Sequence, residues 1–557
     1  MTITPQGQLY LCKTKLENDY KNQLTFSNAS AQLTYFNSTI QHTFDNYTYM
    51  KKDNVINVGK NIDEIIDCNY LFYRNVGFST KYYYCFITRM EYVNENCTAI
   101  HFETDCFQTW QFDITYNKCF VEREHVSDDT VGLHTVPEGL ETGEYIQQKI
   151  TDNIQGFNFY KDSNNHDPKI VLGVSETGLN VSLPSGTMLY NGVYSGLIYL
   201  VFPTFTDCDV YIRYIQRHIT EDVIYTAFMV PNALCPPNGS YNTFTDGSVS
   251  FQYGFINYST GATLMKSASI SKPTVLDANY TPKNKKLLTY PYCYLVVNNN
   301  AGASQMYKYE DFTNINGTAR TDCPFNIYGA LGVGCSVKIY PTHYKQGKSA
   351  LNTTQENYIE GLDGGKFPTC GWRNDAYTNW LTANAVNIGL SLAGDVLQIA
   401  SGINSGVTVS KTGKVGFNAS NTVGGVSNGL GGIINTVASV YQHSLTPETA
   451  KGGTNQGDLN YAMKLTFTPY KMSIKEEYAK IIDNFFSMFG YKVNVVKVPN
   501  ITGRTNWNYV KTIDCNFTGD IPQEDLNIIR TAFNNGITLW HNASTMYNYG
   551  NSNNITS

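Results

Sequence analysis

The residues best suited to metal or nucleophilic chemistry are spread along the chain rather than grouped. Thirteen cysteines and nine histidines are present, yet none forms a CxxC, HExxH or nucleophile-elbow pattern. The tightest group is Cys85, Cys97, His101 and Cys106. A zinc site prefers ligand pairs about two to four residues apart, so packing of cysteines in a core explains this group better. We predict no metal and no cofactor.

Paired carboxylates and glycine-rich stretches offer no stronger case for an enzyme. Glu122 and Glu124 form one pair and Asp128 and Asp129 another, but glycosidase chemistry needs two carboxylates that converge in a cleft. Exposed loop carboxylates are the commoner outcome of such spacing. The glycine-rich stretches 329–334 and 422–435 lack the Lys-Ser/Thr of a phosphate loop. The sequence therefore predicts a protein that is not an enzyme.

Composition indicates a large, mainly β protein with a neutral polar surface. The chain has 557 residues and 42% hydrophobic residues, and only 15% of its residues are charged. Its 42 tyrosines favour strands, and its 45 glycines favour turns. The net charge of −6 disfavours a general grip on nucleic acid but permits weak, sliding contact with DNA. The N-terminal residues lack the order of a signal peptide, so we expect the cysteines to be thiols that mature in a reducing cytoplasm.

Local patterns predict strands in most of the chain and a few helices. We divide the chain by composition into residues 1–135, 136–375, 376–450 and 451–557. Asp105 is a candidate cap of a short helical turn. A second helix is predicted to start at Asp520-Ile521-Pro522-Gln523, with Asp520 as its cap, and to run to Asn534. The other predicted elements are a hairpin of 81–93 and 99–104, strands near 198, 290 and 340, a helix over 475–489, and strands over 491–498 and 537–540.

Residues 381–446 differ sharply in composition from the rest of the chain. Their 66 residues contain eleven glycines, no proline and three charges, Asp395, Lys411 and Lys414. Apolar residues recur at spacings of three and four, which predicts two weakly amphipathic helical legs of about 30 Å, close to the thickness of a bilayer. Gly406 to Gly416 would form a flexible basic tip, with Lys411 and Lys414 against lipid. The apolar residues of the legs are Ala385, Ile388, Leu392, Val396, Ile399 and Ile403, then Val423, Val426, Leu430, Ile433, Val437 and Val440.

Two interpretations of this segment weigh about equally on physical grounds. It is either a buried helical hairpin or flexible insert, or a hairpin in a ring of chains, with one face against copies of itself or lipid and the other lining a polar passage. A single chain would struggle to hide so many uncharged residues, and their exposure would invite aggregation. Asparagines such as Asn384 and Asn435 interrupt both legs, which disfavours spanning of the membrane by one leg alone.

Six stretches resemble the tail-knob, or distal tail tube, protein of the small short-tailed phages with protein-primed genomes. The stretches occur in the same order and flank a similar apolar loop, whereas residues from about 140 to 285 show no such likeness. They are LENDYKN from Leu16, IHFETDCFQTWQFDI from Ile100, VEREHV from Val121, LTYPYC from Leu288, GYKVNVVKVPN from Gly490 and AFNNGITLWH from Ala532.

The resemblance implies a homohexameric ring at the distal end of the virion tail. Residues 1–135 would build a tube-forming β domain and 451–557 a tube-forming α+β domain. Residues 136–375 would form a middle knob domain, and 376–450 the apolar loop that plugs the lumen and later enters the host membrane. Implied partners are other copies of the chain, the collar or proximal tube, double-stranded DNA in passage, the host membrane and host cell-wall carbohydrate. Alternatives are a tail-tip adhesin and a cell-wall hydrolase.

Two further expectations concern the ring wall and the core. We expect a neutral to acidic inner wall, because an attractive wall would hold DNA at every step. We also expect five aromatic side chains of the tube domains to be buried, and a loss of about 3–5 kcal/mol for Trp110→Ala, together with disturbed ring assembly. These side chains are Phe102, Phe107, Trp110, Phe112 and Trp540.

Overall fold

The chain forms two compact units, and both ends of the chain belong to the same one. Unit 1 comprises Met1–Glu144, Ala278–Leu287 and Lys475–Ser557, and unit 2 comprises Tyr145–Asp277 and Leu288–Ile474. The four-part division that composition predicts stays a prediction. The computed structural model describes residues 7–45, 54–76, 79–159, 168–185, 187–190, 193–194, 196–218, 223–235, 240–256, 263–330, 336–345, 355–364, 369–371, 407–409, 415–417, 453–455 and 467–556.

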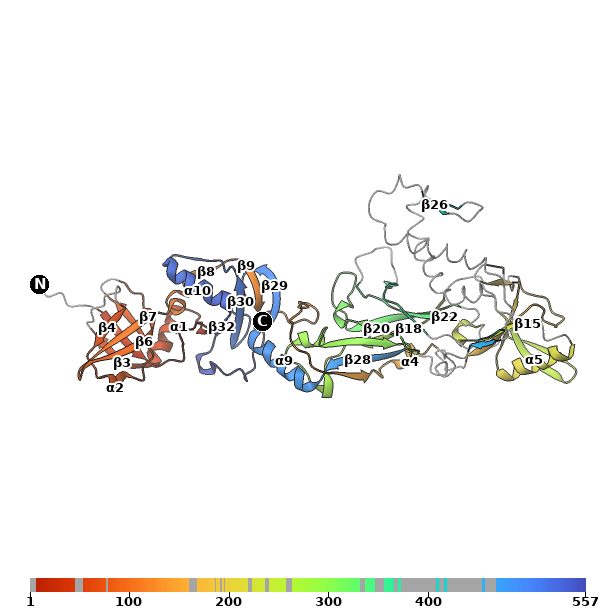
Figure 1. The fold of residues 1–557 in the computed structure, drawn as a ribbon, viewed down its shortest axis with the longest axis horizontal. Helices are drawn as coiled ribbons and strands as arrows, with labels where there is room; N and C mark the ends of the chain where they lie inside the picture. Colours follow the sequence, from red (N-terminus) through yellow and green to blue (C-terminus); the bar gives the residue numbers. More distant parts are fainter. Residues whose placement is uncertain are drawn as a thin grey trace. The chain divides into compact units, whose positions relative to one another are not determined.

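The fold is mainly β, as the composition predicts, and a six-stranded antiparallel sheet forms the first part of unit 1 (Figure 1). The predicted hairpin is confirmed as β6 and β7, where Asn94 faces Cys97 and the Asn96 N–H donates to Asn94 Oδ1 at 3.0 Å. The strands in spatial order are β3 (Ile40–Asp45), β1 (Gly7–Cys12), β5 (Tyr70–Asn75), β6 (Tyr83–Asn94), β7 (Cys97–Thr104) and β4 (Val55–Val58).

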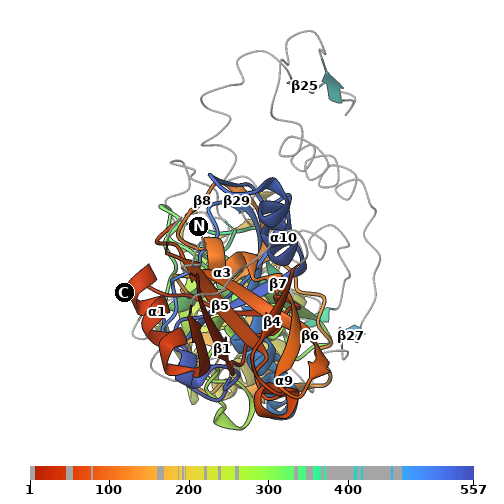
Figure 2. The same cartoon turned by 90° about the vertical axis from the view of Figure 1, so that its left-hand side faces the viewer.

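Each face of this sheet carries a buried cluster, and successive side chains of one strand contribute to both because they point to opposite faces. Tyr70 and Phe72 pack in one cluster with Phe36 of helix α1 (Ala29–Ser38), whereas Leu71 packs in the opposite cluster, which the short helix α2 (Ile62–Ile65) completes. Figure 2 shows α1 together with β1 and β5. The Asn28 side chain caps α1 by accepting from the Ala31 N–H at 2.9 Å.

A five-stranded sheet interlocks the two ends of the chain within unit 1. Strand β9 lies between β29 and β30, and β2 pairs in parallel with β32. Strand β8 (Ile114–Tyr116) likewise pairs with β31 (Phe517–Gly519). The order of the larger sheet is β2 (Asn22–Leu24), β32 (Ile537–Trp540), β30 (Trp507–Ile513), β9 (Cys119–Glu124) and β29 (Tyr491–Lys497). Segments more than 400 residues apart in the sequence thus pair in the same unit.

The predicted C-terminal elements are confirmed except for one cap. Helix α9 (Glu476–Phe489) ends at Gly490, which adopts a positive φ of 64°. Helix α10 (Gln523–Asn535) follows Pro522, so the prediction that Asp520 is its cap is wrong. Pro522 has φ −52° and ψ 135°, so the backbone is still extended there and the helix begins at the next residue. Phe533 of α10 packs with Val510 and Leu539 of the five-stranded sheet.

The described residues of unit 2 form three larger sheets and two short strand pairs. The seven-stranded sheet has the order β16 (Asn242–Asp246), β17 (Val249–Phe255), β14 (Ile198–Phe202), β11 (Lys169–Val174), β15 (Ile224–Val230), β24 (Thr369–Gly371) and β27 (Gly453–Asn455). A four-stranded sheet runs β10 (Tyr145–Lys149), β28 (Thr468–Ile474), β19 (Cys293–Asn298) and β20 (Ser304–Tyr307). A second four-stranded sheet has the order β18 (Thr263–Ser271), β21 (Asp322–Ala330), β22 (Ser336–Pro341) and β23 (Leu362–Asp363). Helix α4 (Ile154–Phe157) and the pairs β12–β13 (Leu189–Tyr190, Val193–Tyr194) and β25–β26 (Val407–Val409, Val415–Phe417) also belong to this unit.

Helix α5 (Phe205–His218) is the main element of unit 2 that we did not predict. Its buried Cys208, Tyr211 and Ile215 recur at helical spacing and pack on the seven-stranded sheet. Thr204 accepts from the Asp207 N–H at 3.1 Å, which completes a Ser/Thr-x-x-Asp/Glu cap signal. Both signals are present in the sequence, but the many strand-like runs around them suggested β structure alone.

Three of the five aromatic side chains expected in the core are buried. Phe102, Phe107 and Trp540 are at most 2% exposed. Trp110 is only half-buried, and polar side chains contact its indole: Nε1 donates to Asp525 at 2.7 Å and the Lys81 ammonium lies 3.5 Å from the ring centroid. The prediction for Phe112 is wrong: the side chain is 43% exposed, since helix α3 (Cys106–Trp110) has already ended and Phe112 lies in the following turn.

Within the segment 381–446, the structure describes only residues 407–409 and 415–417, which lie in the predicted tip. Strands β25 and β26 pair there, with Val407 opposite Phe417, where we predict a flexible loop. The β-branched and aromatic residues at both ends of the tip favour strands, which accounts for the difference. Among the described residues, no helix is long and apolar enough to span a bilayer.

Candidate functional site

The residues predicted to meet lipid or to plug a lumen all lie outside the described residues. This holds for the twelve apolar residues from Ala385 to Val440 and for Lys411 and Lys414. The membrane-active hairpin therefore stays a prediction.

The four residues of the zinc-like group do not converge on one point. Cys85 and Cys106 are buried, and burial raises the pKa of both thiols, which disfavours the thiolate that a metal needs. His101 instead contacts Glu91 at 3.2 Å and Arg89 at 3.2 Å along the β6–β7 hairpin. Within the described residues no group of three or more His, Cys, Asp or Glu side chains is placed to bind a metal.

The paired carboxylates bind cations and backbone N–H groups of unit 1. Glu124 is buried rather than exposed; it accepts from Lys497 Nζ at 2.5 Å and from the Asn500 N–H at 2.9 Å. Glu122 pairs with Lys511 at 2.9 Å. Asp129 accepts from the Tyr491 hydroxyl at 2.6 Å and from the Lys285 N–H at 3.0 Å. These carboxylates fasten segments of the chain together.

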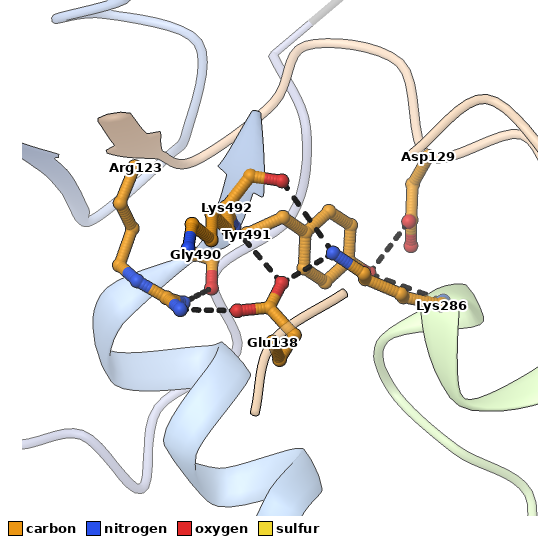
Figure 3. A network of polar contacts seen from close by, with 7 residues as sticks. All are labelled: Arg123, Asp129, Glu138, Lys286, Gly490, Tyr491 and Lys492. Atoms are coloured by element: carbon orange, nitrogen blue, oxygen red, sulfur yellow. Dashed lines mark hydrogen bonds and ion pairs between the residues drawn. The ribbon is translucent and has the colours of Figure 1, made fainter. Parts of the chain in front are cut away.

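Glu138 forms the centre of a buried polar network that joins three distant segments (Figure 3). Its carboxylate pairs with Arg123 of β9 and with Lys286, and it accepts from the Lys492 N–H of β29 at 2.9 Å. Only 1% of the Glu138 side chain and 3% of the Lys286 side chain are exposed. Arg123 also donates to the Gly490 carbonyl at 2.8 Å. Burial lowers the pKa of Lys286, and the adjacent Glu138 carboxylate opposes that shift.

Asp483 of helix α9 holds the segment Ala278–Leu287 in unit 1. This buried carboxylate accepts from the Tyr280 hydroxyl at 2.7 Å, from the Lys283 N–H at 2.8 Å, and from the Asn284 N–H and side chain at 3.0 and 2.7 Å. Residues on both sides of this segment belong to unit 2. Asp483 and Glu138 therefore fix a short crossing segment of the chain to unit 1.

Our sequence interpretation missed Glu138, Lys286 and Asp483. A usable signal existed only for Asp483, which lies between the buried residues Ile482 and Phe486 on the apolar face of α9. A lone charge on such a face usually has a buried partner. Glu138 lies in an irregular segment and Lys286 in a single 3-10 turn, neither long enough for a periodic pattern, so their partners emerge only in the folded chain.

Asp105 is a buried carboxylate whose titration should be visible in the stability of the protein. It caps α3 by accepting from the Gln108 N–H at 3.0 Å, and it accepts from the Tyr70 hydroxyl at 3.0 Å. Burial raises the pKa of Asp105 to about 7, and these hydrogen bonds oppose the shift. The folded protein thus holds a proton on Asp105 that the unfolded chain, with a pKa of about 4, releases more readily.

We expect the contribution of Asp105 to stability to be full below about pH 4 and lost as the pH rises through about 7. Asp105→Asn keeps the acceptor for the Gln108 N–H but does not titrate. The difference in unfolding free energy between wild type and variant, measured by urea denaturation from pH 4 to 8, should therefore shift steadily in favour of the variant. A difference that stays constant with pH would contradict this prediction.

Comparisons with known proteins point to one family. A family model described as the C-terminal domain of the Bacillus phage phi29 tail knob protein gp9 matches residues 254–554, more than half of the chain. A model of the N-terminus of the caudoviral major tail protein matches residues 8–116, which include most of the six-stranded sheet. The resemblance found in the sequence is thereby confirmed.

Full-length relatives and a solved structure agree with these matches. The tail knob protein gp9 of Bacillus phage phi29 is 27% identical over 95% of this chain and 96% of its own length, and that of Bacillus phage B103 is 28% identical over 94% of each chain. The structure of the bacteriophage C1 tail knob protein gp12 matches with a TM-score of 0.63 at 15% identity, over 99% of this chain and 100% of that one. This last likeness concerns the fold alone.

The relatives carry the name of a structural part of the virion rather than of an enzyme. The carboxylates described above, which fasten chain segments together, fit such a role. The chain belongs to the phage tail knob family and is a structural, non-enzymatic component of the virion at the distal end of the tail.

Proposed function

We propose that six copies of this chain form a ring at the tail tip, through which the genome leaves the virion. The match of residues 8–116 to a major tail protein carries this proposal. Those residues fold into an open sheet whose outer strands are β3 and β4, and such edges suit pairing with a neighbouring copy. The ring would meet other tail components at one end and conduct double-stranded DNA along a neutral to acidic inner wall.

The exposed apolar residues of strand β29 give additional support for assembly. This strand lies at the edge of the five-stranded sheet, and Val495 and Val496 are 43% and 63% exposed. An edge strand with exposed valines is a liability for a monomer and a ready contact for a second copy. Native mass spectrometry and negative-stain images of the purified protein should show a hexamer with a central hole. A chain that stays monomeric at micromolar concentration would contradict the proposed ring.

We also propose that residues 381–446 plug the ring and later insert into the host membrane. Support comes from their composition, with three charges and eleven glycines in 66 residues. Weak helices of this kind need neighbouring copies or lipid for stability.

Deleting residues 385–440 should leave folding and ring formation intact and abolish dye leakage from anionic liposomes. Folding should survive because the strands on either side of the segment, β24 and β27, are retained in the deletion variant. The full-length double variant Lys411→Gln/Lys414→Gln serves as the matched control for charge. It should weaken binding to anionic vesicles about thirtyfold, at about 1 kcal/mol per lysine, and leave neutral vesicles unaffected. Leakage that persists after the deletion would assign the membrane activity to another part of the chain, and a deletion variant that fails to fold would mean that the segment is core.

A further inference from the structure

Unit 1 contains a pocket of about 470 Å³ beside the C-terminal segment, and its charged lining is mostly positive. Arg504, Lys283 and Lys285 line it, against one carboxylate, Asp129. The residues Tyr549–Ile555 complete the wall. Lys283 and Lys285 donate their backbone N–H groups to Asp483 and Asp129. Within the described residues, the ammonium group of neither lysine forms an ion pair. Three positive charges and one negative charge therefore line this pocket, and the exposed Asp128, which is not a lining residue, also interacts with Lys285.

Arg504 is the buried member of this set and is poorly satisfied by the protein. Arg504 is 9% exposed, and within the described residues its Nε has no hydrogen-bond partner. One Nη1–H donates to the Asn553 carbonyl at a long 3.4 Å. Burial lowers the pKa of Arg504, whereas the nearby Asp129 raises it. A buried guanidinium with unused N–H donors is costly unless an acceptor comes from outside the chain.

The other polar groups around the pocket are already committed to partners in the protein. Asp129 accepts from the Tyr491 hydroxyl (Figure 3) and from the Lys285 N–H, and within the described residues no ion pair joins it to Arg504. His125 is neutral, since burial lowers its pKa to about 3, and both of its ring nitrogens bond to backbone groups of Tyr509 and Ser487. Asp128, an exposed acid that interacts with Lys285, lies next to Asp129 in the chain.

We propose that this pocket binds a small oxyanion of the phosphate kind, with Arg504 as its principal ligand. A guanidinium presents its N–H groups in a fork that fits the oxygens of a phosphate. Lys283 and Lys285, which are exposed, add charge at the mouth of the pocket. The anion would connect the crossing segment Ala278–Leu287 to the C-terminal segment, so its binding should stabilise unit 1. The source of the phosphate is either the free ion or an ester, since the volume exceeds what one phosphate fills.

The test is titration of the full-length protein with inorganic phosphate, followed by calorimetry and by thermal unfolding. Sodium chloride at matched ionic strength is the control for screening. Wild type should bind saturably and gain in unfolding temperature, and Arg504→Gln should weaken binding about tenfold or more. Arg89→Gln, which removes an exposed arginine of unit 1 paired with Glu91, is the matched control and should bind like wild type.

Equal responses of wild type and Arg504→Gln to phosphate, or no saturable binding at all, would overturn the proposal and leave the pocket to water. If Arg504→Gln fails to fold, the double variant Lys283→Gln/Lys285→Gln decides instead. It should weaken phosphate binding about fivefold to tenfold, and an unchanged affinity would overturn the proposal. Methyl phosphate distinguishes the two sources: tighter binding than inorganic phosphate indicates an ester, and weaker binding indicates the free ion.

Discussion

Replacing Glu138 by glutamine is expected to lower the free energy of unfolding by about 3–5 kcal/mol. The variant keeps the size of the side chain but leaves the buried charges of Arg123 and Lys286 without a carboxylate. Most of the loss should come from these uncompensated cations rather than from a single broken contact. Urea denaturation followed by tryptophan fluorescence measures the change.

Two controls separate this cause from a general effect of removing an acid. Glu91→Gln removes an exposed carboxylate that pairs with Arg89 on β6 and should cost about 0–1 kcal/mol. Replacing Glu138, Arg123 and Lys286 together by apolar residues of similar size should recover most of the loss. The deficit of Glu138→Gln should also shrink as the pH rises, because Lys286, whose pKa burial already lowers, can then lose its proton. A loss of unfolding free energy in Glu138→Gln that is independent of pH and equal to that of Glu91→Gln would contradict the assignment of the loss to uncompensated buried cations.

Truncating Trp540 to alanine is expected to cost about 3–5 kcal/mol, a similarly large loss by a different mechanism. Its side chain is fully buried, its ring centroid lies 5.1 Å from that of Trp507, and its Nε1 donates to Asn22 at 3.0 Å. The cavity would open in the cluster that joins the five-stranded sheet to the six-stranded one. We therefore expect Trp540→Ala to disturb assembly as well as stability.

Phe112→Ala is the matched control, since Phe112 is an aromatic residue of the same unit that is 43% exposed. It should change the free energy of unfolding by about 1 kcal/mol or less. Trp110→Ala, at a half-buried position, should lose an amount of unfolding free energy between those of the other two variants and below the ~3–5 kcal/mol expected from the sequence. Thermal denaturation of the three variants beside wild type checks this order. Equal losses for Trp540→Ala and Phe112→Ala would contradict the assignment of the core.

The sequence by itself determined those elements whose signals are local. The β6–β7 hairpin follows from alternation around a polar turn, α9 from its apolar stripe and Gly490, and β32 from a short apolar run after Gly536. The family follows from long strings of residues near both ends of the chain. Helix α5 had an equally local signal, a cap and a buried stripe, and could have been predicted. Composition marks residues 381–446 as unusual, but their role stays a proposal.

Only the tertiary structure decided how the two ends of the chain join. The insertion of β9 between β29 and β30, and the meeting of Glu138 with Lys286, 148 residues away, depend on backbone groups and charges from segments with no common pattern. Asp105 shows the same division: its role as a helix cap is visible in the sequence, whereas its raised pKa is not. The physical reason is that periodicity and caps act within a few residues, whereas burial and ion pairing depend on which distant segments exclude water together.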